Sequence, residues 1–171
     1  MGKLFYGTQS GMSQSVAEQI QMALSEWIDE IVDISFAKPG EIAEEEFLVL
    51  GGGTYGSGEL TTDWERFWPQ MDKIDFTGKK VALFCLGDAW AYEDNFCSAM
   101  RIFYNKVIEL GGEIIGRGAA ASEYNFDHSE AVIDGFFVGA ALDEMNESSK
   151  TPRRIAIWSM TVREQLVGIA I

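Results

Sequence analysis

Three stretches of the chain are continuously apolar, without the alternation of polar residues that marks a half-exposed strand. They are Leu4–Tyr6, Phe47–Leu50 and Val81–Leu86, and glycine follows each of them directly. Short apolar runs that end in turn residues indicate strands covered on both faces, as in a parallel sheet. Ile31–Ile34 predicts a further strand.

The last predicted strand is interrupted. Glu113–Gly118 begins it, a polar segment through Ser122–Ser129 breaks it, and Phe136–Leu142 is apolar again. Between the strands, apolar residues recur at helical spacing. A first helix is marked by Val16, Ile20, Leu24 and Trp27, and a short one over Asp63–Met71 by Trp64, Phe67 and Trp68. A third helix, over about Asn95–Leu110, is marked by Ala99, Phe103, Val107 and Leu110. The last helix begins at Pro152 and has Ile155, Trp158 and Val162 on its inner face.

Five strands that alternate with helices predict an α/β protein of three layers, with a five-stranded parallel sheet between two layers of helices. The 171 residues suit one domain, 1–171, and 47% hydrophobic with 23% charged residues is ordinary globular composition. The apolar runs are too short to span a bilayer. No apolar signal region opens the chain, so we expect a cytoplasmic protein.

The formal net charge of −14 argues against nucleic acid and membranes as partners, because both attract positive charge. It fits a protein that docks on a basic partner surface, and it fits equally a charge that only keeps the protein soluble. The two cysteines, Cys85 and Cys97, and the single His128 form no metal-binding pattern. We expect Cys85 to be a buried thiol of its strand.

Parallel sheets bind ligands outside the carboxyl ends of their strands, which directs attention to the segments after Tyr6, Leu50 and Leu86. The first of these segments, Thr8–Ser13, offers hydroxyls, a glycine and the start of a helix. Unpaired N–H groups and the positive dipole end of a helix hold phosphate. Since this segment contains no Lys or Arg, it favours a monophosphate that stays bound over a phosphate group that is transferred. The alternative is a plain helix cap by Ser10 or Ser13.

The second segment, Gly53–Leu60, places Tyr55 among glycines, and the third, Leu86–Phe96, carries Trp90 and Tyr92. An aromatic side chain on a turn can stack on a planar ring, although Tyr55 could also fold onto its own loop. In the third segment Asn95 is also a candidate cap for the following helix. The combination of a phosphate-binding segment and two loops with aromatic residues is a more specific signal of a ligand site than any one of the three segments.

These residues carry a family resemblance. The segments GTQSGMSQSVAEQI, GGGTYGSGELTTDWE and GDAWAYEDNFCSAM resemble the three FMN-binding loops of the flavodoxin family, and Tyr124–Asn146 resembles the insertion of its long-chain members. The resemblance implies the strand order 2-1-3-4-5, with the fifth strand split by the insertion, and FMN as cofactor.

The resemblance also assigns the cofactor contacts, segment by segment. It implies that the phosphate is bound by Thr8, Gln9, Ser10, Gly11, Met12 and Ser13. One side of the flavin is lined by Thr54, Tyr55, Gly56, Ser57 and Gly58. The remaining contacts are Leu86, Gly87 and Asp88 at the pyrimidine edge through backbone groups, Tyr92 on the outer face, and Asn95 near that edge.

The chain departs from the family at several of these positions. Tyr55 stands where Trp is common, Met12 and Ser13 replace the usual Asn or Lys followed by Thr, Trp90 is bulkier than usual, and Met145 stands where an acid is common. These changes bear on affinity and redox potential. The family also implies a main-chain flip at Gly56 on reduction, so a β-branched residue there should narrow the gap between the two potentials.

By resemblance, the function is that of a low-potential one-electron carrier. Its partners would be basic redox proteins, with a flavodoxin reductase as donor and another protein as acceptor, and we expect a monomer. No residue near the implied ring position resembles a general acid, base or nucleophile for a bound substrate, which favours a carrier over an enzyme. The main alternative is an FMN-dependent NAD(P)H:quinone oxidoreductase of the same fold. A receiver-type signalling domain and a flavin-free binding module are further alternatives.

Overall fold

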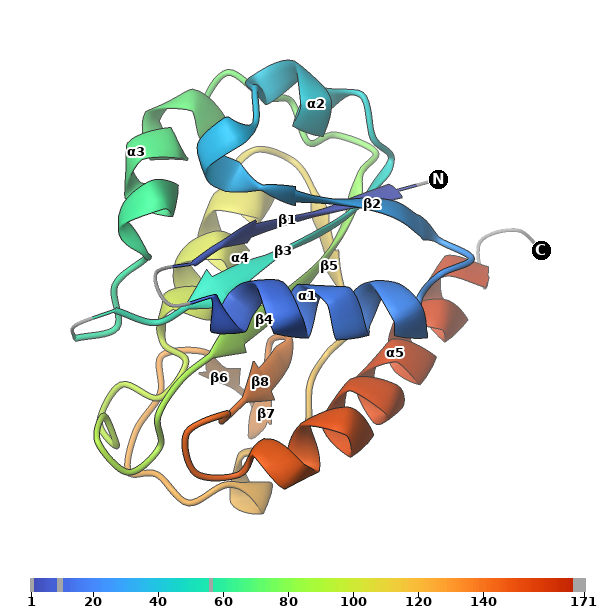
Figure 1. The fold of residues 1–171 in the computed structure, drawn as a ribbon. Helices are drawn as coiled ribbons and strands as arrows, with labels where there is room; N and C mark the ends of the chain where they lie inside the picture. Colours follow the sequence, from blue (N-terminus) through green and yellow to red (C-terminus); the bar gives the residue numbers. More distant parts are fainter. Residues whose placement is uncertain (1, 9–10, 56, 168–171) are drawn as a thin grey trace.

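The computed structural model describes residues 2–8, 11–55 and 57–167. Its main sheet contains the strands β1 (Gly2–Gly7), β2 (Ile28–Asp33), β3 (Phe47–Gly53), β4 (Lys80–Leu86), β5 (Glu113–Ile115) and β8 (Ala140–Leu142). The strand order is β2-β1-β3-β4-β5, and every pairing is parallel. This arrangement confirms the predicted fold class (Figure 1).

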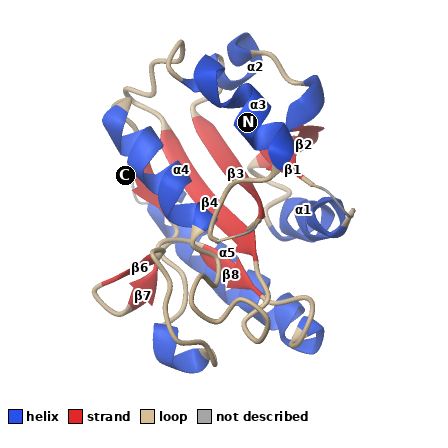
Figure 2. Ribbon diagram, turned by 90° about the vertical axis from the view of Figure 1, so that its left-hand side faces the viewer, coloured by secondary structure: helices blue, strands red, loops and turns tan. Residues whose placement is uncertain are grey.

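The split of the fifth strand is visible in the register of its partner. The first part of β4 pairs with β5, and the last part pairs with β8, from Phe84 opposite Ala140 to Leu86 opposite Leu142. The segment between these two halves contains the short helix η2 (Ala121–Glu123) and the antiparallel strands β6 (Val132–Ile133) and β7 (Phe136–Phe137). Figure 2 shows this hairpin standing apart from the main sheet.

Helices cover both faces of the sheet. One face carries α1 (Met12–Ala23) and α5 (Thr151–Val167), which lie against each other, and the other carries α2 (Pro39–Ala43), α3 (Thr62–Met71) and α4 (Ala99–Glu109) (Figures 1 and 2). Strand residues alternate between two separate cores. Leu48 and Leu50 face the α3–α4 core, whereas Phe47 and Val49 face the α1–α5 core. The continuous apolar runs therefore reflect burial on both faces.

The carboxyl end of β3 requires glycine because the neighbouring main chains approach it closely. A Cβ atom on Gly51 would lie 2.3 Å from the main-chain oxygen of Phe84, and one on Gly52 would lie 2.6 Å from that of Gly7. The glycine triplet thus lets three strands converge directly beneath the turn that follows them.

Several predicted boundaries were wrong by a few residues. Helix α4 begins at Ala99, not Asn95, because Cys97 has a left-handed backbone (φ 54°) that a helix cannot include. Ser98 occupies the N-cap position, so Asn95 does not cap this helix. The second strand begins earlier, at Ile28, and Ile34 belongs to the short helix η1 (Ile34–Phe36).

The first helix ends at Ala23, while Leu24 beyond it is still fully buried. The five-residue helix α2 and the short helix η3 (Ser148–Lys150) were not predicted, since helices this short have no visible apolar period. Cys85 is 1% exposed, which confirms the predicted buried thiol. Within the described residues, no helix combines the length and apolarity needed to cross a membrane.

Candidate functional site

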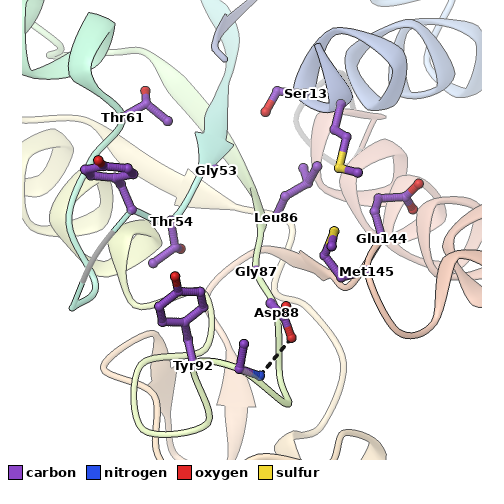
Figure 3. Close-up of a pocket in the computed structure, with 13 residues that line it drawn as sticks. Ser13, Gly53, Thr54, Thr61, Leu86, Gly87, Asp88, Tyr92, Glu144 and Met145 are labelled. Atoms are coloured by element: carbon purple, nitrogen blue, oxygen red, sulfur yellow. Dashed lines mark hydrogen bonds between the residues drawn. The ribbon is translucent and has the colours of Figure 1, made fainter. Parts of the chain in front are cut away.

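A cavity of about 420 Å³ opens at the carboxyl ends of β3, β4 and β8 and beside the start of α1. Its walls come from four segments that are distant in the sequence (Figure 3). The lining residues are Met12, Ser13, Gly53, Thr54, Tyr55, Thr61, Leu86, Gly87, Asp88, Ala91, Tyr92, Glu144 and Met145. The cavity therefore lies at the strand ends to which the binding rule for parallel sheets directed attention.

The start of α1 forms the first wall. Gly11 occupies the N-cap with φ 83°, a conformation that favours glycine, and no side chain of the described residues caps the helix. Ser13 lies within the helix and does not cap it, whereas the alternative cap, Ser10, falls outside the described residues. The first N–H groups of a helix lack intrahelical acceptors. They are therefore available to an anion beside Ser13, which is 4% exposed and lines the cavity.

The segment before this helix is anchored by hydrogen bonds. The hydroxyl of Thr8 accepts a hydrogen bond from the Gly11 N–H (2.9 Å), and the Thr8 N–H donates to Asp63 (2.9 Å). Asp63 also accepts from the Thr61 hydroxyl at 2.5 Å. Helix α3 thus fixes the turn after β1, and the Thr8 hydroxyl orients the helix start without lining the cavity itself.

The turn after β3 forms the second wall. Thr54 is anchored to β4, because its N–H donates to the oxygen of Leu86 (2.9 Å) and its hydroxyl lies 3.0 Å from the sulfur of Cys85. Tyr55 and Glu59 then exchange two main-chain hydrogen bonds of 2.8 and 2.7 Å, which closes a tight turn. Tyr55 lines the cavity and is 53% exposed, so it is not folded away onto its own loop.

The turn after β4 forms the third wall. One carboxylate oxygen of Asp88 accepts from the N–H groups of Ala91 (2.9 Å) and Trp90 (3.1 Å), and its main-chain oxygen accepts from the Tyr92 N–H (2.9 Å). Partial burial opposes ionisation of Asp88, but the hydrogen bonds from Ala91, from the Asn146 side chain and from Trp90 outweigh it and lower its pKa.

Two main-chain groups of this turn already form hydrogen bonds within the protein. The Gly87 N–H donates to Leu142 (3.0 Å), and the Leu86 oxygen accepts from Thr54. The Asp88 N–H and the Gly87 oxygen make no hydrogen bond with the part of the chain that the structure describes. These two groups are accordingly the ones best placed to meet the polar edge of a ligand.

Glu144 and Met145, which follow β8, form a fourth wall across the cavity from Thr54 and Tyr92 (Figure 3). Glu144 accepts a hydrogen bond from the hydroxyl of Thr151, a buried residue that begins α5. This wall was missed apart from Met145. The signal was present, because Leu142 also ends a parallel strand, but the interrupted fifth strand concealed it.

The other predicted site residues divide into two groups. Thr8, Gly11, Ser57, Gly58 and Asn95 lie next to the cavity segments but do not line the cavity. Asn95 lies beside the second turn instead, since a Cβ atom on Gly58 would lie 3.2 Å from its side-chain oxygen. Gln9, Ser10 and Gly56 are outside the described residues. Among the lining residues, sequence reasoning missed Gly53, Thr61, Ala91 and Glu144.

The charges at the cavity have one sign. Asp88 and Glu144 carry the carboxylates of the lining, and no Lys or Arg is among the described residues that form it. Fold and site together define a doubly wound α/β protein with a ligand-sized, anionic and aromatic cavity at the ends of its strands. The chain belongs to the flavodoxin family, whose model, described as Flavodoxin, matches residues 4–158.

Individual relatives agree with this assignment. The chain is 43% identical to a flavodoxin of Synechocystis sp. over 161 residues, which is 94% of each chain, and 39% identical to one of Synechococcus elongatus over 95% of each chain. Among solved structures, a flavodoxin of Fusobacterium nucleatum bound to flavin mononucleotide matches with a TM-score of 0.90 and 29% identity, covering 96% of this chain and 97% of its own.

Proposed function

We propose that this protein binds FMN non-covalently in the 420 Å³ cavity and carries single electrons at low potential between redox partner proteins. The observation that supports this most strongly is the start of α1, which no described side chain caps and which faces the same cavity as Tyr55 and Tyr92. The Fusobacterium relative, which has the same fold, was solved with this cofactor.

The phosphate end of the cofactor suits the first wall. Uncharged donors, namely the helix N–H groups and the Ser13 hydroxyl, can surround a dianion without a cation. Since no lysine stands ready to stabilise a transferred phosphoryl group, we infer that the phosphate serves as an anchor. Gln9 and Ser10, which the family resemblance adds to this set, lie outside the described residues.

The flat ring suits the space between the second and third turns. Tyr55 and Tyr92 are each 53% exposed, as expected of side chains that gain a stacking partner when a ring is bound. The Asp88 N–H and the Gly87 oxygen, which have no partner among the described residues, can donate to a ring acceptor and accept from a ring N–H, respectively. Bound in this way, FMN supplies the redox chemistry, and the chain supplies orientation and electrostatics.

The electrostatics of the walls favour a low potential. Asp88 and Glu144 are close to the place where added negative charge would reside, and the lowered pKa of Asp88 keeps that carboxylate ionised at neutral pH. Stacked tyrosines also exclude the water that would screen such charge. We therefore expect the second electron to enter at a lower potential than the first, with about 59 mV for each tenfold change in equilibrium constant.

The partners follow from the charge of the whole molecule. A net charge of −14 favours association with proteins that present a basic surface around their own redox centre. We propose a flavodoxin reductase as donor, a separate acceptor protein, and a cytoplasmic monomer as the working form.

The decisive experiment is stepwise reduction of the purified protein under anaerobic conditions, followed by absorption spectroscopy. Yellow protein that passes through a blue half-reduced species would support both the cofactor and one-electron transfer. Colourless protein that takes up no added FMN would overturn the proposal. Rapid NAD(P)H oxidation by a quinone without any added reductase would instead favour the oxidoreductase alternative.

A further inference from the structure

The side-chain amide of Asn146 lies between two carboxylates. Its nitrogen donates to Asp88 at 2.8 Å and to the two oxygens of Asp143 at 2.9 and 3.1 Å. The main-chain N–H of Asn146 also donates to Asp143, at 3.0 Å. An amide nitrogen has two hydrogens and can therefore serve two acceptor groups at once.

Asp143 is an unusual member of this group because its side chain has no exposure to solvent. A buried carboxylate is costly unless it is paired or hydrogen-bonded. Its partners among the described residues are Asn146 and the Ala89 N–H, which donates at 3.2 Å. Asp143 thus depends on Asn146 and, through Ala89, holds the turn after β4.

Asp88 continues the connection into the cavity. The oxygen that accepts from Asn146 is the same one that accepts from the Trp90 and Ala91 N–H groups. The main-chain oxygen of Asp88 holds Tyr92. One amide therefore ties the wall formed by Asp88, Ala91 and Tyr92 to the wall that follows β8.

We propose that Asn146 is a positioning residue for the FMN site, which it does not line. It sets the distance between the wall that carries Tyr92 and the wall that carries Glu144 and Met145, so that both meet the ligand together. This inference rests on the proposed function. Without the amide, Asp88 and Asp143 would lack the donor between them and would repel each other.

The first test compares Asn146→Ala with Asn125→Ala. Asn125 is an exposed asparagine of the insertion, without a hydrogen bond to any described residue. FMN affinity is measured by quenching of flavin fluorescence as apoprotein is added. We expect Asn146→Ala to raise the Kd about tenfold or more and Asn125→Ala to change it by less than about twofold.

Amide hydrogen exchange of the apoprotein separates positioning from general stability. In Asn146→Ala, the Ala89, Ala91 and Tyr92 amides should lose protection, while those in the centres of β4 and α4 keep it. Equal loss throughout the chain, or an unchanged Kd, would overturn the proposal. Because this readout needs no cofactor, it tests the connection even if wild-type protein fails to bind FMN, an outcome that would count against the proposed function alone.

A second variant covers the case in which Asn146→Ala does not fold. Asp143→Asn combined with Asn146→Asp keeps a carboxylate–amide pair and the net charge, but turns a carboxylate toward Asp88. We expect a folded protein with FMN affinity reduced about tenfold or more. Wild-type affinity in this double variant would overturn the proposal, and so would loss of folding in both variants, since Asn146 would then serve stability alone.

Discussion

The indole Nε1 of Trp64 donates a hydrogen bond of 2.9 Å to the main-chain oxygen of Gly51. Trp64 is fully buried on α3, and Gly51 begins the glycine triplet at the end of β3. The same tryptophan lies against Gly7 at the end of β1, where a Cβ atom would be 2.4 Å from its ring. One side chain thus fixes two of the strand ends from which the cavity segments begin.

Replacing Trp64 by Phe should lower the free energy of unfolding by about 1–3 kcal/mol, because the buried oxygen of Gly51 loses a donor. Urea denaturation of the apoprotein measures this. Trp68→Phe is the matched control, since Trp68 belongs to the same helix, is only partly buried and makes ring contacts rather than hydrogen bonds with the described residues. Equal losses in the two variants would show that the hydrogen bond is unimportant.

The glycine triplet offers a prediction within three consecutive residues. A Cβ on Gly51 would meet a main-chain oxygen at 2.3 Å, whereas the nearest described atom to one on Gly53 would be the methyl group of Thr61 at 3.6 Å. Gly51→Ala should therefore destabilise the protein by about 1–3 kcal/mol or more through overpacking of the sheet. Gly53→Ala should be tolerated. Thermal unfolding of both variants checks this, and similar melting temperatures would contradict it.

Ser13 allows the phosphate anchor to be tested. Ser13→Ala removes a hydroxyl that lines the cavity, and we expect FMN binding to weaken by about 1.5–3 kcal/mol, the range for hydrogen bonds to charged groups. Binding of riboflavin, which lacks the phosphate, should not change. Ser15→Ala, at an exposed position of the same helix, is the control. If riboflavin binding fell in parallel with FMN binding, Ser13 would not contact the phosphate.

The lowered pKa of Asp88 predicts an acid-sensitive site. Partial burial opposes its ionisation, but hydrogen bonds from Ala91, Asn146 and Trp90 hold the pKa below the ordinary 3.8. The stabilisation is therefore complete above about pH 3.8 and is lost as the pH falls through the lower pKa of the folded state.

Urea unfolding measured from pH 5 down to about pH 2 checks this prediction in the range where native carboxylates become protonated. Asp88→Asn should flatten the decline in stability below about pH 3.8. Asp94→Asn, at an exposed carboxylate of the same loop without a side-chain hydrogen bond to the described residues, should retain the wild-type profile. A wild-type decline in Asp88→Asn would contradict the assignment.

The net charge of −14 predicts salt-dependent docking. The rate of electron transfer from a basic reductase should fall steeply as ionic strength rises toward 0.15 M, where charges separated by more than about 8 Å are largely screened. Stopped-flow reduction at several salt concentrations measures this rate. A rate independent of ionic strength would mean that the acidity serves solubility rather than docking.

Much of the architecture is set by local pattern. The uninterrupted apolar runs of β3 and β4 indicated strands buried on both faces, and the helical spacing of Val16 and Ile20 indicated the buried face of α1. Because all strands are parallel, their carboxyl ends share one edge, so three distant loops were expected to meet. That expectation needed only the order of the elements along the chain.

What the sequence could not determine depends on contacts between distant residues. The pairing of Leu86 with Leu142 brings Glu144 to the cavity, and the side chain of Asn146 bridges the carboxylates of Asp88 and Asp143. The left-handed backbone of Cys97, because of which α4 begins later in the chain than predicted, is likewise not indicated by the neighbouring residues. Residue pattern reports the preferences of neighbours along the chain, whereas these features arise from close packing across the sheet, and only the tertiary structure decides them.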